Sequence, residues 1–453
     1  MAALSRRRFL QTGAASLAGL SIGCHKKRNV LLQGTNTFPK NNIILISIDT
    51  LRPDHLGCYG RKKISPNIDR FANDCIQFDQ HIANAPITAA SHASMFTSLI
   101  PLHHGARSPH QNYPASAISS KVPTLVELLV DGQGFQCVSY NGGVQMDASY
   151  GFGRGFATYE SFDDPDQSKR FSDATAKAQR WLKKERRDPF FLFLHTYEVH
   201  YPFTPNMRDL IAIGGDPDHR WKGIIGWDTI NAINSGKLAM QPNDAKYIVD
   251  CYDAEIVSMD RGFGAFMDFL KANDLYDSSI IVFTSDHGEE FGEHGIIAAH
   301  GHTLYDELLK LPLMLKLPDQ QLAGTIISEQ TSSVDLMPTL LSLLGLESPP
   351  RIQGVDLIDH FNNPNRSEII AVSQMFYRGK FPTAVRTSQE KYFAGSHYFD
   401  LAINPGETKP LPCDKNHRLH RKMEEIVQLN DIRTQEFTPK PEELEKLKQL
   451  GYM

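Results

Sequence analysis

Three runs of apolar and β-branched residues constrain the fold of this chain most strongly. They cover residues 43–48, 190–194 and 280–284, and polar side chains follow each of them. Strands without a polar face belong in the middle of a parallel sheet that is covered on both sides. Between the runs, apolar residues at helical spacing in 259–270 and 334–341 predict the covering helices. The alternation predicts an α/β fold, with a mostly parallel sheet flanked by helices.

The bulk composition is that of a soluble globular protein. The chain has 453 residues, of which 41% are hydrophobic and 22% charged, and its formal net charge is −5. This balance lacks the basic excess of nucleic-acid-binding proteins, so we expect no nucleic-acid partner. The six cysteines are too sparse for a disulfide framework and lack metal-site spacing.

The texture of the sequence changes near Glu368. Short alternating segments at 384–387 and 391–393 predict a small antiparallel β-rich subdomain, closed by a terminal helix at 441–450. We therefore expect a leader and linker in 1–40, a main α/β domain in 41–367 and the C-terminal subdomain in 368–453.

The first residues have the features of an export signal. A basic segment, Ser5-Arg6-Arg7-Arg8, precedes an apolar run at 12–23 that is too short to span a bilayer. It resembles a twin-arginine signal, which predicts the twin-arginine export machinery as a partner and a location in the periplasm or at the cell surface. The alternative is a chance apolar run behind a basic start. Membrane contact is expected only if Cys24 is lipidated, and Ser21 stands where such a signal normally has an apolar residue.

Candidate metal ligands follow two of the predicted strands. Asp286-His287-Gly288 follows one strand and Asp49 follows another, and functional groups gather beyond the carboxyl ends of parallel strands. A carboxylate beside an imidazole suits Mn²⁺ or Zn²⁺ better than a Ca²⁺ cage. The alternative is that these residues only cap loops or form ion pairs.

A third candidate, Thr88, stands at the start of a predicted helix. Small and hydroxyl residues lead from it into Met95 and Phe96. The free N–H groups and the dipole at a helix start favour an anionic ester. A threonine hydroxyl is a poor nucleophile unless a metal lowers its pKa. Alone, Thr88 would more often be a simple helix cap.

Several ordered motifs resemble those of the sulfatase family, within the alkaline-phosphatase superfamily. The resemblance covers nearly everything after the leader, which implies an alkaline-phosphatase-like sheet with a small C-terminal subdomain. The matching segments are 49–60 (DTLRPDHLGCYG), 65–71, 91–94 with His104-Gly105, 198–202, 285–295, 300–307 and 398–407.

The resemblance implies a metal-dependent hydrolase of a sulfate, phosphate or phosphonate ester. Asp49, Asp286 and His287 would hold one divalent cation, with Thr88 completing the shell. Mn²⁺ or Zn²⁺ is favoured, and Ca²⁺ or Mg²⁺ stays open.

The resemblance also implies the roles of the groups around the ester. Thr88 would attack in line and form a covalent ester that water then hydrolyses. His200 and His300 would bind the anion or protonate the leaving group, and the sequence does not divide these roles. His92 occupies the position of the family's anchoring arginine and is a substrate-binding candidate.

Three positions depart from the family pattern. Thr88 replaces the Cys or Ser that becomes formylglycine, Thr50 replaces a second aspartate, and 141–143 reads Asn-Gly-Gly where a Lys-x-His pair is usual. Threonine cannot eliminate sulfate as a formylglycine hydrate does, so phosphodiester or phosphonate chemistry is slightly favoured. Residues 195–200 do not form the Asp-x-x-x-His pair of two-metal relatives, so we expect one metal.

Two alternatives remain open for the function. A phosphotransferase could pass a phospho-group from a lipid to a glycan, and a catalytically decayed site could serve as a binding module. The sequence does not identify the substrate; export favours a polysaccharide ester or a phospholipid-derived ester.

Overall fold

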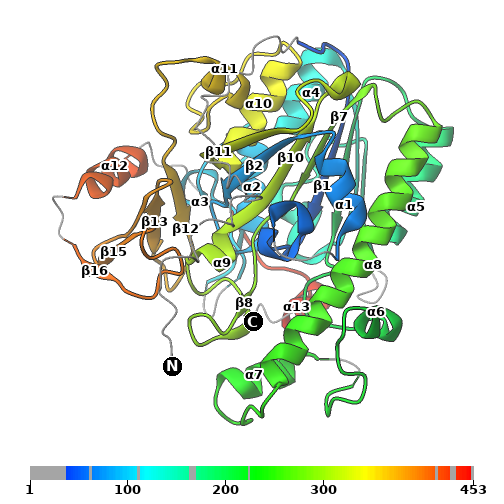
Figure 1. Ribbon diagram of the computed structural model, residues 1–453. Helices are drawn as coiled ribbons and strands as arrows, with labels where there is room; N and C mark the ends of the chain where they lie inside the picture. Colours follow the sequence, from blue (N-terminus) through cyan, green and yellow to red (C-terminus); the bar gives the residue numbers. More distant parts are fainter. Residues whose placement is uncertain are drawn as a thin grey trace, which may run out of the picture.

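The central element is a large mixed sheet. The computed structural model describes residues 37–60, 64–109, 113–162, 170–222, 225–413, 417–428 and 435–449. The predicted leader, with Cys24, lies outside these residues. Eight strands form the sheet in the order β11-β2-β10-β7-β1-β6-β4-β5 (Figure 1). Their bounds are β1 Asn42–Ile48, β2 Ile76–Ile82, β4 Gln136–Asn141, β5 Thr158–Ser161, β6 Phe190–Thr196, β7 Ser279–Thr284, β10 Lys310–Lys316 and β11 Thr325–Ser332.

The sheet is parallel except at one strand. β1 pairs in parallel with both β6 and β7, and β4 pairs in parallel with β5 and β6. β10 runs antiparallel to its neighbours β2 and β7. The expected mostly parallel sheet is thereby confirmed. β6 continues through His195 to Thr196.

Helices cover both faces of the sheet, as the apolar strands require. In β1, Ile44, Ile46 and Ile48 belong to one hydrophobic core, whereas Ile43 and Leu45 belong to another. The first core is closed by α1 (Pro66–Ala72), α5 (Phe171–Lys184) and α8 (Asp244–Ala272). The second is closed by α2 (Thr88–Thr97), α4 (Leu125–Gln133), α10 (Leu336–Leu343) and α11 (Leu357–Asn362). The shorter helices are α3 Pro101–His104, α6 Met207–Ala212, α7 Trp227–Asn234 and α9 Asp306–Leu309.

A second sheet forms the expected C-terminal subdomain. Its five antiparallel strands are β12 Ala371–Gln374, β13 Thr383–Arg386, β14 Glu390–Phe393, β15 His397–Asp400 and β16 Leu411–Pro412, followed by α12 (Arg418–Val427). Two small ribbons complete the described strands: β8 Glu290–Phe291 with β9 Ile297–Ala299, and β3 Ala115–Ala117 with β17 Gln435–Phe437.

The terminal helix exists but lies elsewhere than expected. α13 covers Pro441–Gln449 and contacts the short 3₁₀ turn η3 (Val144–Met146), and the preceding strand β17 pairs with β3. Figure 1 shows α13 (red) beneath the large sheet, away from the orange strands of the small one. The helix therefore covers the main domain and does not close the small sheet.

Candidate functional site

The candidate site lies where three central strands end. Asp49 follows β1, His195 lies near the end of β6 and Asp286 follows β7, so the parallel arrangement brings them together. Thr88 is the first residue of α2, and Ile87 takes the capping position without a side-chain bond. Thr88 is thus not a simple helix cap. The four side chains of Asp49, Thr88, His195 and Asp286 are fully buried.

The two carboxylates are held with one oxygen each turned to the same space. Asp286 Oδ1 accepts hydrogen bonds from the backbone N–H groups of His287 (2.9 Å) and Thr50 (3.3 Å). Asp49 Oδ2 accepts from Thr88 Oγ1 (3.1 Å). Asp49 Oδ1 and Asp286 Oδ2 are buried and accept no hydrogen bond from any described residue. Buried carboxylate oxygens without donors are costly unless a cation neutralises them.

His287 offers a lone pair to the same space. Its Nδ1 lies 2.9 Å from the carbonyl oxygen of Gly288, which fixes the proton on Nδ1. The unprotonated Nε2 lies 3.3 Å from Thr88 Oγ1 and 3.6 Å from Asp286 Oδ2. Burial lowers the pKa of His287, so the ring is neutral, as a metal ligand must be.

The electrostatics of the pair also call for a cation. Burial and the charge of Asp286 raise the pKa of Asp49 well above its ordinary value. Burial would raise the pKa of Asp286 too, but His287, His92 and His195 outweigh it and lower that pKa. Ligand atoms of Asp49, Asp286 and His287 all lie within 4.8 Å of one another. These residues, with the Thr88 hydroxyl, fit one divalent cation such as Zn²⁺ or Mn²⁺.

A second group of potential ligands, His92, His195 and Asp286, is equally compact. The backbone N–H of Gly142 donates to His195 Nδ1 (3.3 Å), which places the ring proton on Nε2, 3.3 Å from Asp49 Oδ2. His195 therefore donates to Asp49 and has no lone pair for a metal. Its role in this geometry is to orient a carboxylate ligand.

His92 is also committed within the protein. Its Nδ1 lies 3.0 Å from the Thr88 carbonyl oxygen and its Nε2 lies 2.9 Å from Ser47 Oγ. The ring is fully buried, and its bond to the Thr88 carbonyl oxygen supports the first turn of α2. The predicted contact of His92 with substrate stays a prediction.

The ring of His300 lies beside those of both His200 and His287. The ring centroids of His200 and His300 are 4.8 Å apart, and those of His287 and His300 are 4.5 Å apart. His300 Nδ1 lies 3.2 Å from a carboxylate oxygen of Glu289. Burial raises the pKa of Glu289 to about 8 and lowers that of His300 to about 3. His302, the other histidine of this segment, binds Glu290 instead (2.9 Å).

Gly288 is required by the turn that carries two ligands. A Cβ atom at this position would lie 1.9 Å from the backbone oxygen of Glu307. This close approach seats Asp286 and His287 against α9.

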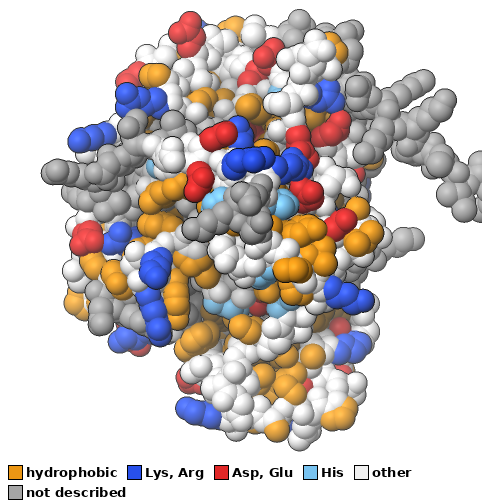
Figure 2. Space-filling model, turned by 90° about the vertical axis from the view of Figure 1, so that its left-hand side faces the viewer, with side chains coloured by type: hydrophobic (Ala, Val, Ile, Leu, Met, Phe, Trp, Pro, Cys, Tyr) orange, Lys and Arg blue, Asp and Glu red, His pale blue; other side chains and the backbone are white. Residues whose placement is uncertain are grey.

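A cavity of about 300 Å³ adjoins the site. His300 and Ala90 line it on the catalytic side, and Arg107 and Ser108 line its wall. Most of the remaining lining is apolar or aromatic: Ile87, Tyr201, Trp227, Met375, Phe376 and Phe381. On the face shown in Figure 2, histidine side chains come to the surface among hydrophobic ones, above the lobe that holds α7. The cavity can receive the alcohol part of an ester.

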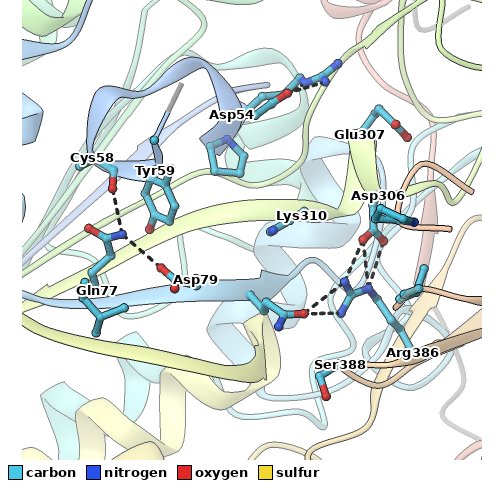
Figure 3. A pocket seen from close by; sticks show the side chains of 17 residues that line it. Asp54, Cys58, Tyr59, Gln77, Asp79, Asp306, Glu307, Lys310, Arg386 and Ser388 are labelled. Atoms are coloured by element: carbon cyan, nitrogen blue, oxygen red, sulfur yellow. Dashed lines mark hydrogen bonds and ion pairs between the residues drawn. The ribbon is translucent and has the colours of Figure 1, made fainter. Parts of the chain in front are cut away.

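A larger cavity, of about 740 Å³, lies between the loop after β1 and the C-terminal sheet (Figure 3). Lys310 points into the cavity. Several other charged side chains of the lining are paired with one another, as Arg386 is with Asp306 (2.9 Å). Arg52 lines it and binds Asp54 (2.9 Å) and Glu293 (2.7 Å). None of the predicted catalytic or metal-binding residues lines this cavity.

Three residues of the site were not found by sequence reasoning. His195, Glu289 and Gln145 each lie beside a predicted residue, and all are fully buried. The signal for His195 was a polar residue ending an apolar strand. Gln145 carried no such signal, because it follows two glycines in a segment without periodicity.

Comparison with known proteins gives the relationship. The Sulfatase family model matches residues 41–346, about two thirds of the chain. The chain belongs to the sulfatase family. A second model, the C-terminal part of N-sulphoglucosamine sulphohydrolase, matches residues 292–425.

Individual sulfatases are distant relatives of this chain. It is 21% identical to an ulvan-active sulfatase of Formosa agariphila, over 85% of this chain and 82% of the other. A structure solved with its substrate D-glucosamine-2-N,6-O-disulfate has a TM-score of 0.65 at 20% identity, covering 91% and 98% of the two chains. The phosphonate monoester hydrolase of Agrobacterium radiobacter has a TM-score of 0.65 at 18% identity, covering 88% and 100%. These similarities support the hydrolase class and the alkaline-phosphatase-like fold.

Proposed function

We propose that this sulfatase-family hydrolase cleaves a monoanionic phosphorus ester, a phosphodiester or phosphonate monoester, with Thr88 as nucleophile at a single divalent cation. The observation that carries the proposal is the position of the Thr88 hydroxyl. It lies 3.1 Å from Asp49 Oδ2 and 3.3 Å from His287 Nε2, at the start of α2.

Asp49, Asp286, His287 and Thr88 would hold the cation. When bound there, the cation lowers the pKa of the threonine hydroxyl and neutralises charge on the ester. A single cation is supported by the hydrogen bonds of His92 and His195, which commit their ring nitrogens elsewhere.

Thr88 Oγ1 gives up its proton to Asp49 Oδ2, which accepts its hydrogen bond (3.1 Å). It attacks the phosphorus and forms a new O–P bond as the bond to the alcohol oxygen breaks. The departing oxygen takes a proton. We assign its delivery to His300 together with Glu289, because the His300 ring lines the cavity that receives the alcohol and His200 does not. Burial raises the pKa of Glu289 to about 8, and its carboxyl lies 3.2 Å from His300 Nδ1, so it replaces the proton that His300 Nε2 gives to the departing oxygen. Water then attacks the phosphothreonine ester and releases Thr88.

The charge of the surroundings favours a monoanion. The described titratable side chains around Thr88 are the carboxyl groups of Asp49 and Asp286 and several histidines. Burial lowers the pKa values of these histidines. Among the described residues that line the cavity Arg107 is the one arginine, and it is bound to Glu436. A dianionic phosphate monoester would lack the fixed cations it needs, whereas one negative charge suits one divalent cation.

A sulfate ester on a saccharide is the second candidate. It is also a monoanion, and the relatives include an ulvan-active sulfatase and a protein solved with a disulfated glucosamine. The aromatic walls of the cavity offer flat apolar surfaces to a sugar ring. The leader adds the proposal that the protein acts outside the cytoplasm, on a polysaccharide or phospholipid-derived ester. No described helix is both long and apolar enough to cross a membrane.

The test uses the folded protein loaded with Mn²⁺ or Zn²⁺. Metal content and turnover of an aryl phosphodiester, an aryl phosphonate and an aryl sulfate are measured for wild type, Thr88→Ala and Thr97→Ala. Thr97 lies on the same helix and donates to Ala93 O (2.6 Å), away from the ligands. We expect one metal per chain and a loss of about 10³-fold or more for Thr88→Ala alone.

Other outcomes point to the alternatives. Preference for the aryl sulfate would support the second candidate. Turnover that requires an added alcohol acceptor would indicate a phosphotransferase. A protein without stoichiometric metal and without turnover would be a binding module.

A further inference from the structure

The amine of Lys310 stands without a partner among the described residues. Lys310 is the first residue of β10, it is partly buried, and its side chain points into the larger cavity (Figure 3). No described residue accepts a hydrogen bond from the amine or forms an ion pair with it. Burial lowers the pKa of Lys310, whereas the carboxylates of Asp306 and Asp79 act to raise it. A bound anion would favour the charged amine and supply the partner it lacks.

The other cations that line this cavity are already engaged. Arg52 forms ion pairs with two acidic side chains, and Arg386 forms one with Asp306. Within the described lining, Lys310 is therefore the one cation that is left for a ligand. A single ammonium group matches a single negative charge, because its three donors can bind one carboxylate or sulfate group.

Asp79 adds a free acceptor to the same cavity. It lies on β2, which pairs with β10, and its Oδ1 accepts a hydrogen bond from Gln77 Nε2 (3.2 Å). In the part of the chain that the structure describes, no donor reaches Asp79 Oδ2. A hydroxyl group of a ligand can donate to this oxygen. Part of the remaining lining is apolar: Ile326, Leu401 and Pro405.

We propose that this cavity is a second binding site, separate from the catalytic one, for a sugar unit that carries one negative charge. Lys310 binds the anionic group, a carboxylate or a sulfate, and Asp79 Oδ2 accepts a hydrogen bond from a hydroxyl of the same sugar. The cavity volume, about 740 Å³, is typical of pockets that enclose small ligands. None of the predicted catalytic or metal-binding residues lines this cavity, so the inference goes beyond the proposed function and does not depend on hydrolysis.

The experiment measures the binding of glucuronate, glucose 6-sulfate, glucose and acetate by calorimetry. Full-length wild type is compared with Lys310→Met, which removes the charge, and with Lys310→Arg, which keeps it. Lys246→Met is the control for a lost charge, because Lys246 is largely exposed on α8 and pairs with Asp250 of the same helix (2.5 Å). Each titration uses the metal-loaded protein and then the chelated protein, which separates binding at Lys310 from binding at the catalytic metal.

We expect both anionic sugars to bind wild type and Lys246→Met, with and without metal. Lys310→Met should weaken this binding about tenfold or more, since a hydrogen-bonded charge is lost. Lys310→Arg should bind the sugars more tightly than Lys310→Met. Without sugar, Lys310→Met should melt no lower than wild type, because it removes a partly buried charge that has no described partner.

Three results would overturn the inference. Glucose or acetate could bind as tightly as glucuronate, which would mean that the site does not recognise the charge or does not recognise the sugar. Chelated Lys310→Met could bind the anionic sugars as tightly as wild type, or wild type could bind neither of them at millimolar concentrations. A protein that turns over none of the esters but binds these sugars through Lys310 would leave the inference standing, although the proposed function would fall.

Discussion

Asp49 shows how one residue can be unfavourable in the empty protein and useful in the loaded one. Its carboxylate is fully buried, and burial together with the charge of Asp286 raises its pKa well above the ordinary value. Such a pair is stable only with a shared proton or a bound cation. A site of this kind destabilises the metal-free protein, and metal binding removes that destabilisation.

Replacing Asp49 with Asn should therefore change stability in opposite directions with and without metal. The Asn amide can donate to Asp286 Oδ2, so we expect the metal-free protein to gain about 1–2 kcal/mol. The rise in melting temperature on adding Zn²⁺ or Mn²⁺, worth about 2.7 kcal/mol at a hundredfold excess over Kd, should disappear. Thermal unfolding with and without chelator measures both effects.

Asp79→Asn provides the control for this substitution. Asp79 accepts from Gln77 Nε2 (3.2 Å) and lines the larger cavity, away from the ligands. Its variant should keep the full metal-dependent rise. Undiminished metal binding by Asp49→Asn would remove Asp49 from the ligand set.

At the scale of elements, a buried ion network joins the small sheet to the large domain. Lys391 of β14 is fully buried and lies 2.8 Å from Asp306 Oδ1 of α9 and 2.9 Å from Glu407 Oε1. Arg386 of β13 binds the same Asp306 (2.9 Å). The two cations hold the pKa of Asp306 well below its ordinary value against the effect of burial. Because α9 follows the segment of His300, this network also supports one side of the site.

Lys391→Met should cost about 3–5 kcal/mol of unfolding free energy, because it leaves two buried carboxylates with too little positive charge. Denaturant unfolding measures the loss. The comparison is Arg418→Met, which breaks partly exposed pairs with Glu390 (2.8 Å) and Glu368 (3.5 Å) and should cost about 1 kcal/mol or less. Equal losses in the two variants would show that the Lys391 network does not hold the sheets together.

For the whole molecule, buried neutral histidines make the unfolding free energy depend on pH. Burial lowers the pKa of His81 and of His104 to about 3. His81 bridges β2 and β11 through Thr331 (2.9 Å), and His104 lies 3.2 Å from Ser94 Oγ. Between pH 6.5 and 3 these two histidines bind protons in the unfolded chain but stay neutral in the folded protein. The unfolding free energy should therefore fall as the pH falls through this window.

His81→Gln should flatten this dependence. Each such histidine contributes about 1.4 kcal/mol per pH unit in the middle of the window. The slope of the unfolding free energy against pH is measured by denaturant unfolding between pH 6 and pH 4. In His81→Gln it should fall by the amount that corresponds to about one fewer proton taken up on unfolding. His104→Gln should remove a similar, additive amount, since the two rings share no partner. An unchanged slope in both variants would mean that the folded protein protonates these rings.

What the sequence by itself determined was the set of strands and the chemistry at their ends. Apolar runs specify a central sheet through burial alone, and parallel strands bring the residues that follow them to one edge. Asp49, Asp286 and His287 could be placed together for that reason. Thr88 could be placed at a helix start, and only the resemblance to the family joined it to the three ligands.

Only the tertiary structure decided how each polar atom is used. The Gly142 N–H sets the proton position on His195, and the Ala89 N–H sets the orientation of Gln145. The placement of α13 under the large sheet likewise depends on the pairing of β17 with β3. These features rest on contacts between residues far apart in the chain, and local patterns of hydrophobicity carry no information about them.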